Sequence, residues 1–197
     1  MKFDTIFFIG PQGSGKGTQA KLLAQKTGFF YWEMGGILRE LAKSGTELGN
    51  KIGALIDQGV LLGDDILLDV LKHKLSELPK GQGVIFDGVP RRLSQAEFLL
   101  AHLHSIGFEN FVTLFIDLPE EESIKRLLLR AQTENRKDDS REAIVFRLQQ
   151  YHEDTMPVLD YLKQNSTFIT IDGLPPIPQV TEQIDAAMAA LDTAHHG

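Results

Sequence analysis

The chain has 197 residues, enough for one domain with a sizeable core, and its 42% hydrophobic and 24% charged residues are ordinary for a soluble globular protein. Its net charge of −7 argues against a general nucleic-acid binder, which would normally carry a basic face. The absence of cysteine excludes disulfides, thiolate metal sites and cysteine nucleophiles. No apolar run reaches the roughly 18 residues of a membrane span, and Ile6–Ile9 is too short for a signal peptide, so a cytoplasmic location is expected.

Short apolar runs alternate with longer amphipathic segments along the chain. Strands are predicted at Thr5–Ile9, Phe29–Trp32, Gly83–Phe86, Phe111–Leu118 and Phe168–Ile171. Helices are predicted at Gly15–Thr27, Asp65–Leu78, Pro119–Arg130, Ser140–Thr155 and Pro178–Leu191. This alternation predicts an α/β fold in which a parallel five-stranded sheet is covered by helices on both faces. In such sheets, ligands bind beyond the carboxyl ends of the strands.

A glycine-rich loop follows the first predicted strand. Gly10–Thr18 reads GPQGSGKGT, and its glycines can turn backbone N–H groups toward phosphate oxygens at the start of a helix. Lys16 adds a mobile charge for the β- and γ-phosphates of a nucleotide. The general P-loop pattern places Ser or Thr directly after the lysine; Gly17 intervenes here, so the hydroxyl of Thr18 is expected near the metal ion. The loop predicts a P-loop NTPase-type fold, and the alternative is a turn that merely joins strand to helix.

A second motif, FDGVPRRLSQ, follows the third predicted strand. Asp87 comes off the strand end, where a carboxylate could hold Mg²⁺ through water. Gly88 and Pro90 predict a rigid turn that presents Arg91. The amide of Gln95 offers donors and an acceptor suited to the edge of a base. The alternative is an aspartate that caps a turn beside a surface arginine.

Four arginines later in the chain are further candidates for binding phosphate. Arg126 and Arg130 are four residues apart, so both project from one face of a helix, and Arg136 and Arg147 follow. Phosphoryl transfer requires neutralisation of charge around the transferring group more than it requires a nucleophile. Arginine suits this task because it stays protonated and binds phosphate through two N–H groups. A surface ion pair is the alternative for any one of them, so the prediction depends on the set.

Five sequence segments occur in order along the chain: GPQGSGKGTQA, GILRE, DGVPRRLSQAE, RAQTENRKDD and FRLQQYHEDTMPV. In order and approximate spacing they resemble the adenylate kinase family over essentially the whole chain. The resemblance implies a single kinase domain (1–197), with a core (1–32, 64–130 and 137–197), a small helical NMP-binding insertion (33–63) and a short lid (131–136). A lid of this length, in a chain without cysteine, differs from the zinc-ribbon lid of some relatives, so no zinc is expected.

The resemblance also implies roles for individual residues. The ATP site would comprise Gly13, Ser14, Gly15, Lys16, Gly17, Thr18, Arg126, Arg130 and Gly173. The AMP site would comprise Met34, Arg39, Val60, Leu61, Leu62, Gly88, Val89, Pro90, Arg91, Gln95, Arg136 and Arg147. The catalytic set would be Lys16, Arg91, Arg126, Arg130, Arg136 and Arg147. Thr18 and Asp87 are expected to hold Mg²⁺ through water, and Arg126 would stack on the adenine of ATP.

The chain departs from the family pattern in one stretch. Glu33–Gly36 reads EMGG where the family usually has Ser-Thr-Gly-Asp, so Met34 cannot hydrogen-bond a base and Gly36 supplies no carboxylate. Val89 stands where Phe is usual. Gln95 matches the adenylate-type residue, which favours AMP as the acceptor.

The reaction implied is Mg·ATP + AMP = 2 ADP by direct in-line transfer, with closure of the lid and the insertion over the two substrates. A monomer without a nucleic-acid or membrane partner is expected. One alternative is a kinase of the same fold that acts on UMP, CMP or another small acceptor, which Met34 leaves open. Another alternative is a module that binds ATP without transferring a phosphoryl group. The number of arginines argues against it, because such a module needs fewer charges around the γ-phosphate.

Overall fold

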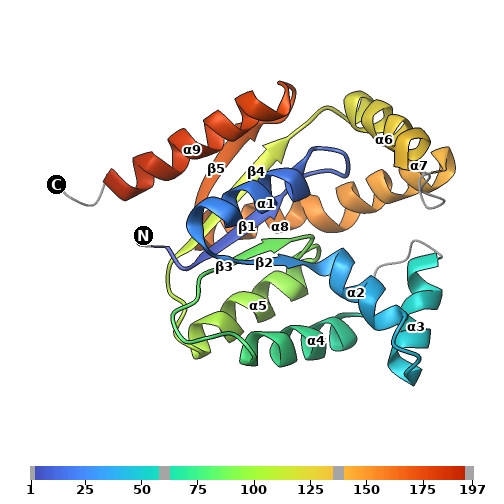
Figure 1. Ribbon diagram of the computed structural model, residues 1–197, viewed down its shortest axis with the longest axis horizontal. Helices are drawn as coiled ribbons and strands as arrows, with labels where there is room; N and C mark the ends of the chain where they lie inside the picture. Colours follow the sequence, from blue (N-terminus) through green and yellow to red (C-terminus); the bar gives the residue numbers. More distant parts are fainter. Residues whose placement is uncertain (1–2, 58–62, 135–139, 194–197) are drawn as a thin grey trace.

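Figure 1 shows the fold in a computed structural model, which describes residues 3–57, 63–134 and 140–193. A sheet of five parallel strands forms the centre of the molecule, in the order β2-β3-β1-β4-β5. The strands are β1 (Thr5–Ile9), β2 (Phe30–Glu33), β3 (Val84–Asp87), β4 (Phe111–Asp117) and β5 (Thr167–Asp172). The predicted parallel five-stranded sheet is confirmed, and each predicted strand lies within one residue of its observed bounds.

The helices confirm the predicted alternation with some differences in bounds. They are α1 (Lys16–Thr27), α2 (Met34–Ala42), α3 (Glu47–Asp57), α4 (Asp64–Ser76), α5 (Leu93–Ser105), α6 (Glu120–Glu134), α7 (Arg141–Gln150), α8 (Met156–Asn165) and α9 (Ile177–Thr193). Among the described helices, α5 and α8 have no counterpart in the predicted elements. None of the helices in the described ranges has the length and apolar character needed to cross a bilayer.

Helix α6 extends beyond its predicted C-terminal end. The sequence predicts an end at Arg130, but α6 continues to Glu134, because residues 131–134 contain neither Gly nor Pro to stop it. The first four residues of the predicted lid (131–136) are therefore helical. The remainder of that lid, which includes Arg136, lies outside the described residues.

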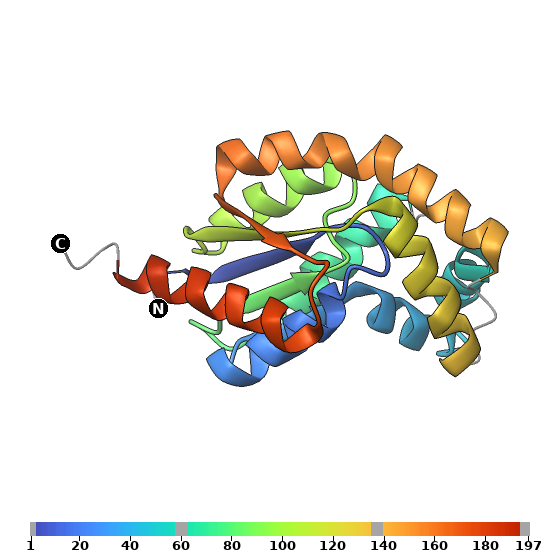
Figure 2. The same ribbon diagram turned by 90° about the horizontal axis from the view of Figure 1, so that it is seen from above.

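Helices cover both faces of the sheet, as Figure 2 shows from above. Along β1, Ile6 and Phe8 pack in the cluster that includes α1 and α9, whereas Phe7 and Ile9 pack in the cluster that includes α4, α5 and α8. All four side chains are at most 3% exposed. Successive residues of a strand face opposite sides, and both sides are buried here, which explains why the strand is continuously apolar.

The carboxyl edge of the sheet is the expected place for a ligand site. β1 lies between β3 and β4, so the direction of strand order changes beside it, and in α/β sheets ligands bind beyond the strand ends at such a point. α2 and α3 occupy the predicted insertion and lie on one side of this edge, with α6 and α7 on the other (Figure 1). Among the described residues of the insertion, Glu33 is the one that lies in a strand, at the end of β2, although the insertion was expected to be helical.

The long helix after the predicted lid changes its hydrogen-bond pattern once. Ser140 caps its start as predicted, since its hydroxyl accepts a hydrogen bond of 3.2 Å from the backbone N–H of Ala143. After α7 the chain makes a π-helical turn at Tyr151–Thr155 and continues directly as α8. π-Helical turns are rare and occur often at functional sites, and this one adjoins the cavities described next.

Candidate active site

The predicted phosphate loop connects β1 to α1. Gly15 is the N-cap of α1 and has a φ of 89°, a left-handed conformation that residues with a side chain rarely adopt. The Lys16 ammonium lies against the loop and donates hydrogen bonds to the carbonyl oxygens of Gly10 (2.6 Å) and Pro11 (2.7 Å). The loop and the first turn of α1 therefore present a cation and backbone N–H groups at one place, which is the arrangement that binds phosphate.

The ionisation of Lys16 responds to its surroundings. Burial disfavours the charged form and lowers the pKa of Lys16 from 10.5 to about 8, with further lowering by Arg91 and Arg130 and an opposing effect from the Asp87 carboxylate. Two guanidinium groups, those of Arg91 and Arg130, thus act on this ammonium. Such crowding is unfavourable without an anion, so the site favours a polyanionic ligand.

A cavity of about 510 Å³ opens in front of the loop. Most of the predicted ATP-site residues line it: Gly13, Gly15, Lys16, Gly17, Thr18, Arg126 and Arg130. Ser14 is only 2% exposed and is not among the lining residues, because its side chain points into the protein near the Lys16 ammonium. The structure therefore brings most of the predicted set together on this wall, whereas the side chain of Ser14 is buried behind it and Gly173 is not among the lining residues.

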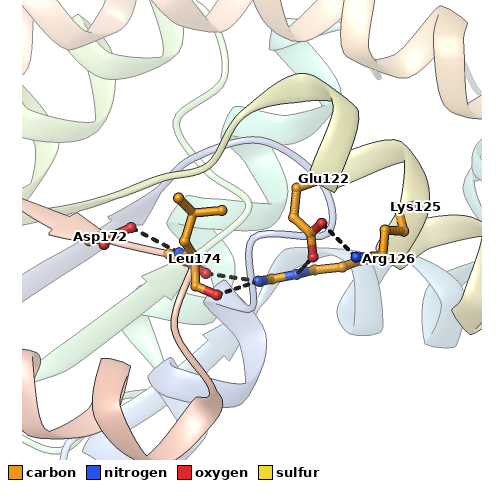
Figure 3. Close-up of polar contacts among 6 residues, drawn as sticks. Glu122, Lys125, Arg126, Asp172 and Leu174 are labelled. Carbon is orange, nitrogen blue, oxygen red and sulfur yellow. Dashed lines mark hydrogen bonds and ion pairs between the residues drawn. The ribbon is translucent and has the colours of Figure 1, made fainter.

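Arg126 connects two segments that are far apart in the sequence. Figure 3 shows it reaching from α6 to the turn after β5, where its guanidinium donates hydrogen bonds to the carbonyl oxygens of Gly173 and Leu174, each 2.9 Å. Its Nε donates to Glu122 at 3.0 Å, one turn earlier in the helix. Hydrogen bonds from Arg126 and Lys125 hold the pKa of Glu122 below its usual value. Arg126 and Gly173 are thus side by side, as the predicted adenine site requires.

A second cavity, of about 190 Å³, lies between the loop and the helical insertion. Predicted AMP-site residues that line it are Met34, Arg39, Gly88, Arg91, Gln95 and Arg147. Its other walls are mainly apolar and include Leu38 and Ile56 of the insertion. An apolar cleft with a few convergent polar groups is the usual form of a site for a small molecule.

Three predicted AMP-site positions, Val60, Leu61 and Leu62, lie outside the described residues. Val89 is fully buried in the core, so its side chain packs inward and only its backbone is left for a ligand. Pro90, which follows a cis peptide bond, lines a small gap between the two cavities together with Lys16 and Arg91. The predicted AMP site is therefore assembled in part, and the contribution expected of Val89 is restricted to backbone atoms.

Gln95 is held by a hydrogen-bond network. Its side-chain oxygen accepts from the backbone N–H of Arg91 (2.9 Å), and its amide nitrogen donates to the carboxylate of Asp64 (2.8 Å). The hydroxyl of Ser94 donates to the same carboxylate. Burial alone would raise the pKa of Asp64, but these two hydrogen bonds and the nearby Arg92 lower it. Gln95 thus keeps one amide N–H and one lone pair for a ligand, fewer than the isolated side chain offers.

Asp64 provides a test of this network. Replacing Asp64 with Ala is expected to raise the KM for the monophosphate about fivefold, because Gln95 loses the acceptor that orients it, a bond of roughly 1 kcal/mol. The KM for ATP should change less than about twofold, since Asp64 lies outside the larger cavity. Asp65→Ala is the matched control, because it also removes a carboxylate from the first turn of α4. An equal rise of the KM for the monophosphate in the two variants would show that Asp64 only stabilises the start of α4 and does not orient Gln95.

Three arginines belong to both cavities. Arg39, Arg91 and Arg147 line the larger cavity and the smaller one, and so does Gln12 of the loop. Gly88 has a φ of 85° and its carbonyl accepts from the Arg91 Nε at 2.9 Å, which confirms that the turn after β3 presents Arg91. Desolvation by burial and the neighbouring Arg147 lower the pKa of Arg91, whereas Asp87 opposes this. The two cavities therefore meet at a cluster of guanidinium groups.

Asp87 ends β3 on the wall of the larger cavity. Its carboxylate accepts a hydrogen bond of 3.0 Å from the hydroxyl of Tyr31, and burial together with the Asp87 charge raises the pKa of Tyr31. A side chain at Gly17 would begin 3.1 Å from an Asp87 oxygen, so the glycine after Lys16 leaves room for this carboxylate. Thr18 lines the same cavity and is exposed.

Some residues of the site were not predicted from the sequence. Gln12 and Tyr151 line the junction of the cavities, and within the described residues their buried oxygens have no hydrogen-bond partner. Tyr31 and Asp64 position predicted residues. Gln12 carries a signal, since it lies inside the phosphate loop. No sequence signal identifies Asp64, because its partner Gln95 is 31 positions away.

Comparison with known proteins agrees with this geometry. A family model described as adenylate kinase matches residues 8–167. The chain belongs to the adenylate kinase family. It is 41% identical over 186 residues to an adenylate kinase of Phocaeicola vulgatus, which covers 94% of this chain and 98% of the relative. Adenylate kinases of Thermus thermophilus (39% over 183 residues, 93% and 96% covered) and Thermobifida fusca (39% over 186 residues, 94% and 97% covered) are also similar.

The family membership confirms the predicted resemblance and the α/β P-loop kinase fold. It also confirms that the chain is a phosphotransferase of the nucleoside monophosphate kinase class. The roles assigned to individual residues are not decided by these comparisons. They depend on the geometry of this chain, which the proposals below use.

Proposed function

We propose that this chain catalyses the reversible reaction ATP + AMP = 2 ADP by direct transfer of the γ-phosphoryl group. The observation that carries the proposal is that Arg39, Arg91 and Arg147 line both cavities. A phosphoryl group that passes between two nucleotides spreads negative charge over its oxygens at the junction, and fixed guanidinium groups stabilise this charge. A module that only binds ATP needs no such cluster beside a second cavity.

The larger cavity is the proposed donor site. The backbone N–H groups of Gly13–Thr18 would bind the phosphates, with the Lys16 ammonium at the β- and γ-phosphates. Arg126, placed beside the turn at Gly173, would stack on the adenine, and Arg130 of the same helix would reach the phosphates. A planar guanidinium already fixed by two carbonyl oxygens offers a rigid face for a base.

The smaller cavity is the proposed acceptor site. Its apolar walls, which include the buried Met34, fit the faces of a base, and the remaining amide N–H and lone pair of Gln95 fit its edge. Arg39, Arg91 and Arg147 would bind the acceptor's phosphate. Val60, Leu61, Leu62 and Arg136 are proposed for the same site from the family resemblance.

Magnesium is the implied cofactor, and the residues present fit it. Among the described residues, His, Asp and Glu form no group of three that could ligate a metal, so the protein offers few direct ligands. Mg²⁺ commonly keeps several waters and binds through one carboxylate and substrate phosphates. Asp87 and Thr18 on the wall of the larger cavity would hold these waters. The bound ion would supply neutralisation of the phosphate charge.

No protein nucleophile is needed, because an oxygen of the acceptor's phosphate attacks the γ-phosphorus directly. Lys16 and the arginines would hold both phosphates in line, which removes much of the entropic barrier. We also propose that the core, the insertion (33–63) and the lid (131–136) act as one kinase domain whose closure excludes water. We further propose that the protein is a cytoplasmic monomer that binds neither nucleic acid nor membranes.

A coupled assay with Mg·ATP and a panel of monophosphates tests the function. AMP should be the preferred acceptor, with a kcat/KM about 100-fold above those of CMP and UMP, because the pocket retains the Gln95 amide at a base edge. Turnover with a pyrimidine acceptor alone would contradict AMP as the substrate and assign the chain to the related pyrimidine class. Tight ATP binding without turnover would contradict the proposed transfer altogether.

A further inference from the structure

The end of β2 carries a carboxylate that the proposed mechanism does not use. Glu33 lies beside Asp87 in the sheet, at the carboxyl edge, and it lines the larger cavity. One of its oxygens is 2.8 Å from Nη2 of Arg39 in α2, and the other is 3.5 Å from the ammonium of Lys21 in α1. Glu33 therefore connects the helical insertion to the core helix that follows the phosphate loop.

Glu33 and Gly36 share one small volume. A Cβ atom at Gly36 would lie 3.3 Å from the carboxyl carbon of Glu33 and 3.5 Å from one of its oxygens. A contact of 3.3 Å is tighter than nine in ten real Cβ contacts, so a side chain at position 36 would require this carboxylate to shift by a few tenths of an ångström. The carboxylate of residue 33 thus occupies the space that a side chain of residue 36 would otherwise enter. A glycine at position 36 therefore fits a long acidic side chain at position 33.

The carboxylate of Glu33 holds Arg39 in place but occupies only part of its hydrogen-bonding capacity. The structure gives one hydrogen bond from Arg39 to Glu33, through Nη2, and places Nη1 3.1 Å from the Cβ position of Gly35, on the wall of the smaller cavity. A guanidinium has five N–H donors, so several remain for an anion in that cavity. The carboxylate also offsets repulsion between Arg39 and the other cations of the cluster.

We propose that Glu33 is the positioning residue that aims Arg39 at the phosphate of the monophosphate acceptor, and that the absence of a side chain at Gly36 leaves it room in this position. This inference rests on the proposed function, because it assigns a task within the same acceptor site. The side chains of Glu33 and Arg39 are 34% and 48% exposed, so their ion pair adds little to the stability of the fold. The ion pair should instead strengthen AMP binding, because a guanidinium that is already held in place loses less conformational entropy when it binds the phosphate.

Four proteins test the proposal: the wild type, Glu33→Ser, Gly36→Asp and the double variant Glu33→Ser/Gly36→Asp. Calorimetry with AMP is the primary measurement, and the KM values for AMP and ATP are the second. Glu33→Ser should weaken AMP binding about tenfold, the effect of one hydrogen bond to a charged group. Gly36→Asp alone should also weaken AMP binding, because two carboxylates would compete for one space.

The double variant is the decisive protein. A carboxylate returns from position 36 to the volume that residue 33 has vacated, so AMP affinity should recover to within about threefold of the wild type, a strongly non-additive result. Glu33→Gln, which keeps the shape without the charge, replaces Glu33→Ser as the single variant if that variant does not fold. Glu47→Ser is the matched control, because it removes a carboxylate paired with Lys51 on α3, away from both cavities, and it should leave AMP affinity unchanged.

The outcomes separate this inference from the function that underlies it. Unchanged or tighter AMP binding in Glu33→Ser would overturn the positioning role, and so would a double variant as weak as the two single effects combined. A wild type that binds no AMP would instead overturn the proposed acceptor, and the role of Glu33 with it. Weak binding in each single variant with recovery in the double variant supports both.

Discussion

Replacing Lys16 with Met is expected to lower the rate of phosphoryl transfer about 10²- to 10³-fold, the usual effect of removing one preorganised charge from a transition state. The Lys16 ammonium lies inside the phosphate loop, and methionine keeps most of the stem without the charge. The KM for AMP should change much less, because Lys16 is absent from the wall of the acceptor cavity. Steady-state kinetics in both reaction directions measure this.

The same substitution should not lower the unfolding temperature at pH 7. Burial lowers the pKa of Lys16 to about 8, so the charged form is disfavoured in the folded protein and its removal relieves that cost. The folded state holds fewer protons at Lys16 than the unfolded state between pH 8 and 10.5, so wild-type stability should rise relative to Lys16→Met as the pH increases through this window.

Lys26→Met is the control for Lys16, because it removes a lysine from the last turn of the same helix, where the side chain is exposed and pairs with Asp185. It should retain wild-type kinetics. If Lys16→Met kept near-normal rates, or if both variants lost activity equally, Lys16 would not be a transition-state contact. If the stability of the wild type relative to Lys16→Met fell as the pH increased from 8 to 10.5, burial would not be the cause of the lowered pKa.

The sheet and the phosphate loop could be predicted because their signals are local. Thr5–Ile9 is a continuous apolar run that ends at a glycine-rich loop, and its observed bounds are the predicted ones. A strand buried on both faces needs apolar residues at every position, so composition alone identifies it. The loop's glycines and Lys16 are likewise contiguous, and all that the sequence leaves open is which side chains face the cavity, as with Ser14.

The remaining features depend on contacts between distant segments. Asp64 and Gln95 lie on different helices, and neither periodicity nor motif spacing indicates that they meet. The π-helical turn at Tyr151–Thr155 has no composition signal, yet it follows Arg147 closely and places the Thr155 hydroxyl 3.1 Å from the Arg91 carbonyl oxygen. Sequence reasoning proposed residues that the structure places on the cavity walls, such as Lys16 and Arg91, and it missed most of those that hold them in place.

The second large effect is expected at Arg91, where methionine should lower kcat/KM about 10³-fold or more, as for other arginines that neutralise a transferring phosphoryl group. Arg91 lines both cavities and the small gap between them, so it would contact donor and acceptor phosphates together. Arg91→Lys should restore little, because an ammonium cannot reproduce the planar fork of N–H groups.

The fold should survive this change, because the contacts of Arg91 with Gln95 and Thr155 use its backbone N–H and carbonyl groups, which methionine keeps. Arg92→Met is the matched control: it is the next residue, its ion pairs run to Asp64 (3.6 Å) and Asp154 (3.7 Å), and it lines neither cavity. Its kcat/KM should stay within about threefold of the wild type, since partly exposed ion pairs at such distances contribute little. Comparable losses in the two variants would mean that the arginine pair stabilises the turn after β3, and the transition-state role of Arg91 would have to be abandoned.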